Sequence, residues 1–209
     1  MGTSFAYSAA AFVDGNKVES IGPFADQAAS EAVRKTLEPK GYRVADGSGG
    51  IVCELWLRNG VVAGKTDVSG AVYTWMPESA LVGVIRFPNG ARDFRGQAIK
   101  PGVYTLRYAV HPADGNHLGI SPIRDFLMMI PIGMDQNPDA AFKFEELAKM
   151  SAKAAGTNHP GILSLASPES KGPAAVSTND HGHLVLSATI KAASGEMPFA
   201  MIVKGIAEQ

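Results

Sequence analysis

The stretch VYTLRYAV, residues 103–110, alternates large apolar side chains with polar or smaller ones. Successive side chains of a β-strand point to opposite faces, so this alternation gathers the large residues on one face. They are Tyr104, Leu106, Tyr108 and Val110. The other face carries Thr105, Arg107 and Ala109. One apolar and one mixed face are typical of an antiparallel sheet that covers a core on one side.

Other short segments are also rich in Val, Ile, Tyr and Phe and are bounded by Gly, Pro, Asn or Asp, which predicts strands. These segments are residues 42–46, 51–58, 71–75, 80–87, 123–131, 183–192 and 198–206. The sequence ASGE, residues 193–196, favours a hairpin between the last two. The chain is therefore predicted to be mainly β, an antiparallel β-sandwich of the immunoglobulin-like or jelly-roll-like kind. We expect six apolar residues to be buried together in it: Leu106, Tyr108, Leu186, Ile190, Phe199 and Met201.

Two segments have the apolar spacing of amphipathic helices, near residues 26–38 and 138–155. Asp26 is a candidate N-cap of the first, and Glu31 and Lys35 are spaced to pair on its surface. Asn137 is a candidate N-cap of the second, which Gly156 should end. No strand–helix–strand rhythm recurs, so both helices are expected on the outside of a single domain spanning residues 1–209.

Composition excludes several classes of partner. The 209 residues include 19 basic and 20 acidic side chains, a net charge of −1, and the basic residues are scattered, which argues against nucleic acid. The longest apolar run, residues 126–132, is far shorter than the ~20 residues of a spanning helix, so no membrane span is predicted. Cys53 is the only cysteine, and its place in an alternating strand predicts a small buried residue rather than a reactive thiol.

The segment GQAIKPGVYTLRYAVHPADGNHLGISPIRDFLMMIPIGMD, residues 96–135, with GYRV and CELWLRNG upstream, resembles an uncharacterised group of bacterial β-sandwich proteins. That group is largely predicted to be secreted and carries the signature PGvYTLRY…DGnHlGtSPyRDFlLLiP. The resemblance implies a secreted or periplasmic β-sandwich and carries over no catalytic residue. No signal peptide is visible at the start of the sequence, so this location is an expectation from the resemblance.

Histidines suggest the one cofactor that the sequence offers, a transition metal. His111 and His117 flank a proline-bounded loop that also holds Asp114, and whether both imidazoles share a face depends on the length of its turn. His181 and His183 stand two residues apart, which in an extended backbone points them the same way. A firm site needs three ligands or more, so the metal hypothesis requires the two segments to meet. Otherwise the loop is structural, its polar residues bonding its own backbone.

Three other side chains are candidates for ligand or partner contact. Trp56 shares a strand face with Glu54 and Arg58 and could stack a ligand, or it could lie under a helix. Arg124 could contact a partner, as could Asp114. Asp125, which follows Arg124 on the opposite strand face, more naturally anchors a loop amide than takes part in chemistry.

Motifs of familiar enzymes are missing from the sequence. It has no Gly-x-Ser-x-Gly elbow, P-loop, dinucleotide fingerprint, His-Glu-x-x-His or paired-cysteine zinc motif. We therefore expect no catalytic residues and no organic cofactor, and a non-enzymatic binding or structural module whose partner is a protein, a cell-envelope component or a second copy. The alternatives are a metal-binding protein or metalloenzyme that uses the histidines, and a small-ligand module.

Overall fold

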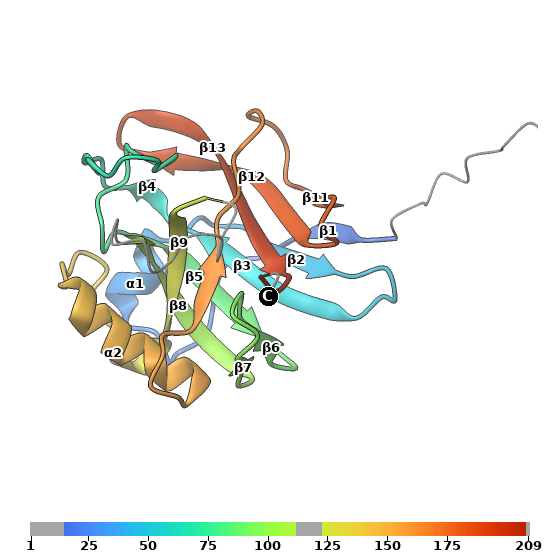
Figure 1. Cartoon of the computed structure of the whole chain (residues 1–209), viewed down its shortest axis with the longest axis horizontal. Coiled ribbons are helices and arrows are strands. Elements are labelled where there is room, and N and C mark those ends of the chain that lie inside the picture. Colours follow the sequence, from blue (N-terminus) through green and yellow to red (C-terminus); the bar gives the residue numbers. More distant parts are fainter. Residues whose placement is uncertain (1–14, 112–122, 208–209) are drawn as a thin grey trace, which may run out of the picture.

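The computed structural model describes residues 15–111 and 123–207. Its strands are β1 Lys17–Ile21, β2 Gly41–Ala45, β3 Ile51–Leu57, β4 Asn59–Val61, β5 Leu81–Phe87, β6 Ala91–Arg92, β7 Ala98–Ile99, β8 Gly102–Val110, β9 Asp125–Pro131, β10 Ile162–Ser164, β11 Ala175–Thr178, β12 Leu184–Ala192 and β13 Gly195–Lys204. The helices are α1 Glu31–Thr36 and α2 Phe144–Ala155, with a 3-10 turn η1 at Ile132–Met134. The fold is mainly β with two helices, as predicted (Figure 1).

Two sheets face each other in a sandwich-like arrangement. The larger has the order β1-β2-β3-β5-β8-β9-β10 and is antiparallel throughout. The smaller has β11, β12 and β13 in order, and β4 pairs in parallel with the far end of β12. The predicted hairpin is confirmed, because Ala192 pairs with Gly195 across the turn between β12 and β13. A two-stranded ribbon, β6-β7, completes the fold.

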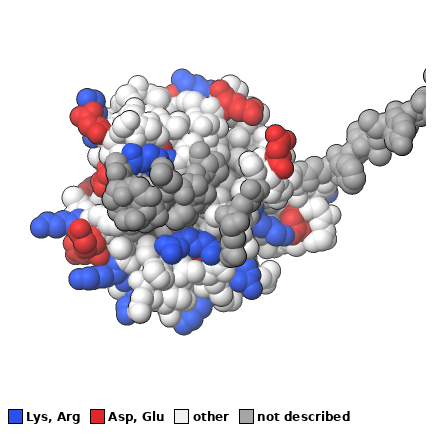
Figure 2. Space-filling view, viewed as in Figure 1, with Lys and Arg blue, Asp and Glu red and all other residues white. Residues whose placement is uncertain are grey.

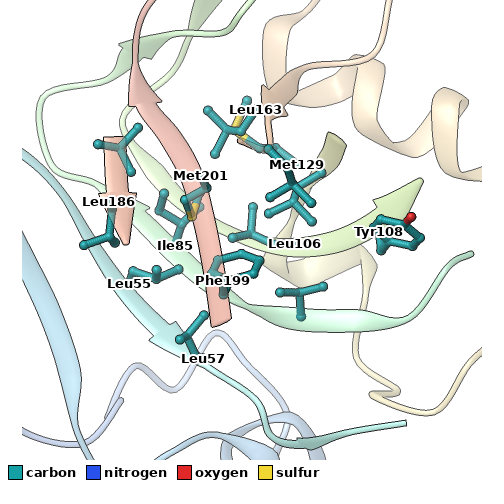
Figure 3. Close-up of a cluster of buried hydrophobic side chains, with 14 of the residues drawn as sticks. Leu55, Leu57, Ile85, Leu106, Tyr108, Met129, Leu163, Leu186, Phe199 and Met201 are labelled. Atoms are coloured by element: carbon teal, nitrogen blue, oxygen red, sulfur yellow. The ribbon is translucent and has the colours of Figure 1, made fainter. Parts of the chain in front are cut away.

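The main core lies between the two sheets. Leu106 in the middle of β8 pairs with Gly83 of β5 and Met129 of β9, and its side chain is fully buried. From the smaller sheet, Leu186, Phe199 and Met201 point back toward it (Figure 3). All six residues predicted to be buried together belong to this one cluster: Leu106, Tyr108, Leu186, Ile190, Phe199 and Met201. Strand alternation thus identified the buried face of β8, β12 and β13.

Helices cover the outer face of the larger sheet (Figure 1). Leu147 of α2 packs over β9 and β10 with Phe126, Met128 and Ile162. Val33 of α1 packs in a third cluster with six buried apolar partners, among them Phe24 and Trp56. Within the described ranges, no helix is both long enough and apolar enough to cross a bilayer.

Both helices begin later than predicted. Ser30, rather than Asp26, caps α1, because its Oγ accepts a hydrogen bond from the Val33 N–H; Asp26 instead accepts from Ala28 in a turn. The second helix begins at Phe144 rather than at Pro138, because Asn137 closes a separate turn by accepting from the Asp139 N–H. The predicted ends are better: Gly156 closes α2 in the left-handed conformation at φ 69°. The Glu31–Lys35 pair also forms, at 2.7 Å.

A buried ion pair explains why residues 135–142 stay outside the helix. Arg107 and Asp135 are both 1% exposed, and two guanidinium nitrogens of Arg107 donate to the two carboxylate oxygens of Asp135 at 2.8 and 2.7 Å. Arg107 also donates to the carbonyls of Ser79, Asn137 and Ala140. Carbonyls bonded to this guanidinium are held at β8, so the segment forms a turn and irregular backbone there instead of the first turns of a helix.

Residues 71–75, predicted as a strand, form turns instead. The backbone N–H groups of Val72 and Tyr73 donate to the carboxylate of Asp125 at 2.8 and 2.9 Å, where a strand would offer them to a neighbouring strand. The Tyr108 hydroxyl donates to the same carboxylate at 2.6 Å. Asp125 is therefore the loop anchor that its sequence position favoured.

The edges of the two sheets meet. At one side β1 lies against β11, and the Asn16 side chain donates to the Thr178 hydroxyl at 3.0 Å. At the other side β10 lies beside β13, where Leu165 forms a bridge with Met201 and the Ala166 N–H donates to the Ala200 carbonyl. Contacts therefore join the two sheets along both sides.

Candidate functional site

A cavity of about 700 Å³ opens at one end of the sandwich, and we call it the mouth cavity. The larger sheet contributes the β2–β3 turn and the start of β3, and the two-stranded ribbon contributes β6. The smaller sheet contributes the β11–β12 turn and the end of β13. Glycines make up much of its wall: Gly47, Gly50, Gly90, Gly182 and Gly205. Because glycine has no side chain, these positions leave the opening unfilled. A volume of this size falls in the range of sites for small organic ligands.

An ion pair ties the two sheets together at the mouth cavity. Lys204, at the end of β13, donates to a carboxylate oxygen of Asp46 at 2.8 Å, and the other oxygen accepts from Ser48 and the Gly50 N–H. The hydrogen bond from Lys204, followed by those from Ser48, lowers the pKa of Asp46 well below its usual value. Asp46 is therefore a carboxylate at neutral pH, and its charge is balanced by Lys204.

The predicted histidine pair forms one wall of the mouth cavity. Asn179 organises the β11–β12 turn, because its side-chain oxygen accepts from the N–H groups of both His181 and His183 at 3.1 and 2.9 Å. Gly182 between them has φ 74°, which suits glycine. The two imidazoles stack with centroids 5.8 Å apart, so they do point the same way.

His183 is held firmly, and it in turn holds the end of the chain. It is 6% exposed, its ring lies edge-on to Phe94 at 5.3 Å, and its Nε2 lies 3.0 Å from the Ile206 carbonyl oxygen. A carbonyl can only accept, so Nε2 donates this hydrogen bond, and the buried Nδ1 has no hydrogen-bond partner among the described residues. A Cβ at Gly205 would lie 2.5 Å from Cδ2 of this ring, so only glycine fits there.

The remaining lining is amphipathic. Arg92 donates to the Gly96 carbonyl at 2.8 Å, and among the described residues no carboxylate pairs with its guanidinium. Ile51 and Ile206 are 38% and 43% exposed, which is unusual for large apolar side chains here, and both line the mouth cavity. A site with one unbalanced cation and exposed aliphatic surface can hold an anion that also has an apolar part.

His111 does not share this site. It is 7% exposed, stacks on Phe126 with centroids 4.3 Å apart, and lines a different cavity of about 460 Å³ with acidic neighbours, Asp67, Glu78 and Glu145. His117 and Asp114 lie outside the described residues. Within residues 15–111 and 123–207, no three His, Cys, Asp or Glu side chains are grouped as a metal site would need. The metal hypothesis stays a prediction, without support from these residues.

Arg124 and Trp56, the other candidates, are engaged with the protein itself. Arg124 donates to the carbonyl oxygens of Ser69 and His111, which fastens two loops. Trp56 is 4% exposed and is covered by Phe24, as in the alternative that placed it under a helix. Its indole N–H donates to the Gly22 carbonyl at 2.9 Å, so its ring offers no surface to a ligand.

Sequence reasoning found one wall of the mouth cavity and missed the rest. Asp46, Arg92 and Lys204 come from three distant segments, and each stands alone among ordinary turn or strand residues. Nothing local signals that they converge. Surface charge gives no further guidance, because side chains of both signs are spread over the face shown in Figure 2.

Comparison of the chain with protein-family models, with curated proteins and with solved structures gave no match in any of the three.

Proposed function

We propose that this chain is a non-enzymatic binding module that acts outside the cytoplasm, and that it receives its ligand in the mouth cavity. The observation that carries the proposal is the lining of that cavity, where Arg92 and exposed Ile51 and Ile206 surround a space of about 700 Å³. The ligand is a small molecule or an exposed group of a cell-envelope component. The extracytoplasmic location rests on the resemblance to secreted β-sandwich proteins.

The rigidity of the surroundings supports a binding role. Lys204 and Asp46 join the two sheets across the opening, and Asn179 and the His183–Ile206 hydrogen bond fix the opposite wall. A preformed site loses little conformational entropy when its ligand enters, which favours affinity.

A cavity-blocking variant tests the proposal. Ile51→Trp places a larger ring at an exposed strand position of the cavity, and Val62→Trp is the matched control, since Val62 is 41% exposed but does not line it. Compounds from a small-molecule library should raise the melting temperature of the wild type and of Val62→Trp but not of Ile51→Trp. Compounds that stabilise all three proteins equally, or no stabilising compound at all, would contradict the proposal.

A further inference from the structure

We infer that the ligand of the mouth cavity is an amphipathic carboxylate, a molecule with one carboxylate group that pairs with Arg92 and an aliphatic body that covers Ile51 and Ile206. This inference rests on the proposed function and adds to it the chemical class of the ligand. The lining of the mouth cavity contains the charged side chains of Asp46, Arg92 and Lys204.

The charged groups of the lining leave one cation without a counter-ion. Asp46 and Lys204 lie 2.8 Å apart and neutralise each other, and Ser48 and Gly50 satisfy the remaining acceptor positions of Asp46. Arg92 donates only to a neutral carbonyl, that of Gly96. A cationic or neutral ligand would leave Arg92 uncompensated, whereas an anion with a single charge balances the site.

The shape of a guanidinium selects the kind of anion. Its planar N–H groups match the two oxygens of a carboxylate, which it binds through paired hydrogen bonds. Arg92 uses one nitrogen for Gly96, and its other nitrogens remain to donate to a ligand. A dianionic phosphate would bring one more negative charge than Arg92 balances, with Asp46 in the same lining.

The apolar part of the lining requires an aliphatic body. Ile51 and Ile206 leave more than a third of their surface open to solvent, and the buried Leu184 and Val203 lie deeper in the same wall. Covering exposed aliphatic surface is favourable in proportion to its area. His183 acts as a positioning residue, because its hydrogen bond to the Ile206 carbonyl places that side chain at the rim.

Titration calorimetry with octanoate tests this inference in the full chain. Octanoate should bind the wild type, while octanamide, which has the same body without the charge, and inorganic phosphate, which has charge without the body, should not. Arg92→Gln should weaken octanoate binding roughly tenfold or more, because a hydrogen bond to a charged group is lost. Arg95→Gln is the matched control: Arg95 is exposed in the turn that follows β6 but does not line the cavity.

Three results would overturn the inference: no octanoate binding at millimolar concentration, equal binding of octanamide, or equal binding by Arg92→Gln. The blocking variant separates this failure from that of the proposed function. If octanoate fails but other compounds lose their effect in Ile51→Trp, the ligand class is wrong and the binding site stands. If no compound depends on Ile51, both proposals fail together.

Discussion

Two ion pairs join distant segments of this protein, and they differ in what surrounds them. Arg107 and Asp135 are both buried, and the carbonyls of Ser79, Asn137 and Ala140 accept hydrogen bonds from the same guanidinium. The side chains of Lys204 and Asp46 are 62% and 23% exposed and border an open cavity. The first pair holds a segment on the sheet, whereas the second keeps two sheet ends at a fixed separation. In this protein the buried pair stabilises the fold, and the partly exposed pair borders the candidate site.

The largest expected effect is at the buried pair. Asp135→Ala leaves the Arg107 guanidinium buried without a counter-ion, which should cost about 3 to 5 kcal/mol of unfolding free energy. Urea unfolding followed by circular dichroism measures this. Glu31→Ala, which removes an exposed pair with Lys35, serves as control and should leave the midpoint nearly unchanged. Equal effects of both variants would remove the distinction between buried and exposed pairs.

The next largest loss of unfolding free energy is expected in the apolar core. Leu106→Ala removes a fully buried side chain between the sheets and should cost roughly 2 to 5 kcal/mol through lost transfer energy and the cavity left behind. The same unfolding assay applies. A loss below about 0.5 kcal/mol, the size typical of surface sites, would show that the face of β8 assigned to the core is wrong.

A smaller loss of stability is expected at Asp125, a buried carboxylate that accepts hydrogen bonds from uncharged donors. Tyr108→Phe removes one donor to the Asp125 carboxylate and leaves those of Val72 and Tyr73 in place, so we expect a loss of about 1.5 to 3 kcal/mol. Asp125 keeps the Tyr108 hydroxyl protonated, because burial and this hydrogen bond raise the pKa of Tyr108. Thermal unfolding of the wild type and of Tyr108→Phe at neutral pH measures the loss of stability. A change as large as that of Asp135→Ala would mean that the neutral network matters as much as the ion pair.

The smallest expected effect on stability is at the Asp46–Lys204 pair of the mouth cavity, and it depends on pH. The pKa of Asp46 is lowered in the folded protein by Lys204, so the pair contributes stability above the unfolded value near 3.8 and loses it as pH falls toward the folded value. Lys204→Gln should therefore melt slightly lower than the wild type at pH 7, and the gap should narrow steadily as the pH falls from about 3.8 toward 2. Melting temperatures of both proteins, measured from pH 7 to pH 2, test this prediction. A gap that stays constant with pH would exclude an electrostatic origin.

Strand alternation was enough to predict the core, because burial of one face fixes the side-chain period of two. The helix starts could not be predicted in the same way. Asn137 has a good capping side chain, but Arg107, which is thirty residues upstream and on another element, binds the Asn137 and Ala140 carbonyls and keeps them out of a helix. The strand predicted over 71–75 failed for the same reason, since Asp125 captures its backbone donors. Tertiary hydrogen bonds override local preference in both cases.

The candidate site could be predicted even less completely from local sequence patterns. The spacing of His181 and His183 predicted a shared ring direction for an extended backbone, but the rings stack across a turn in which Gly182 has φ 74°. The charge balance of the mouth cavity depends on Asp46, Arg92 and Lys204 meeting in space. Their meeting follows from sheet order, and no spacing along the chain encodes it.

The meeting of the sheet edges has a consequence for how the protein behaves at high concentration. Unpaired strand edges are templates for aggregation, since their free N–H and C=O groups can recruit another chain. Here the Tyr73 hydroxyl and the Ala166 N–H bond to Ala200 along the outer side of β13, and the Phe94 N–H bonds to Ile162 on β10. These backbone groups are already occupied, so growth by strand addition is disfavoured on this side.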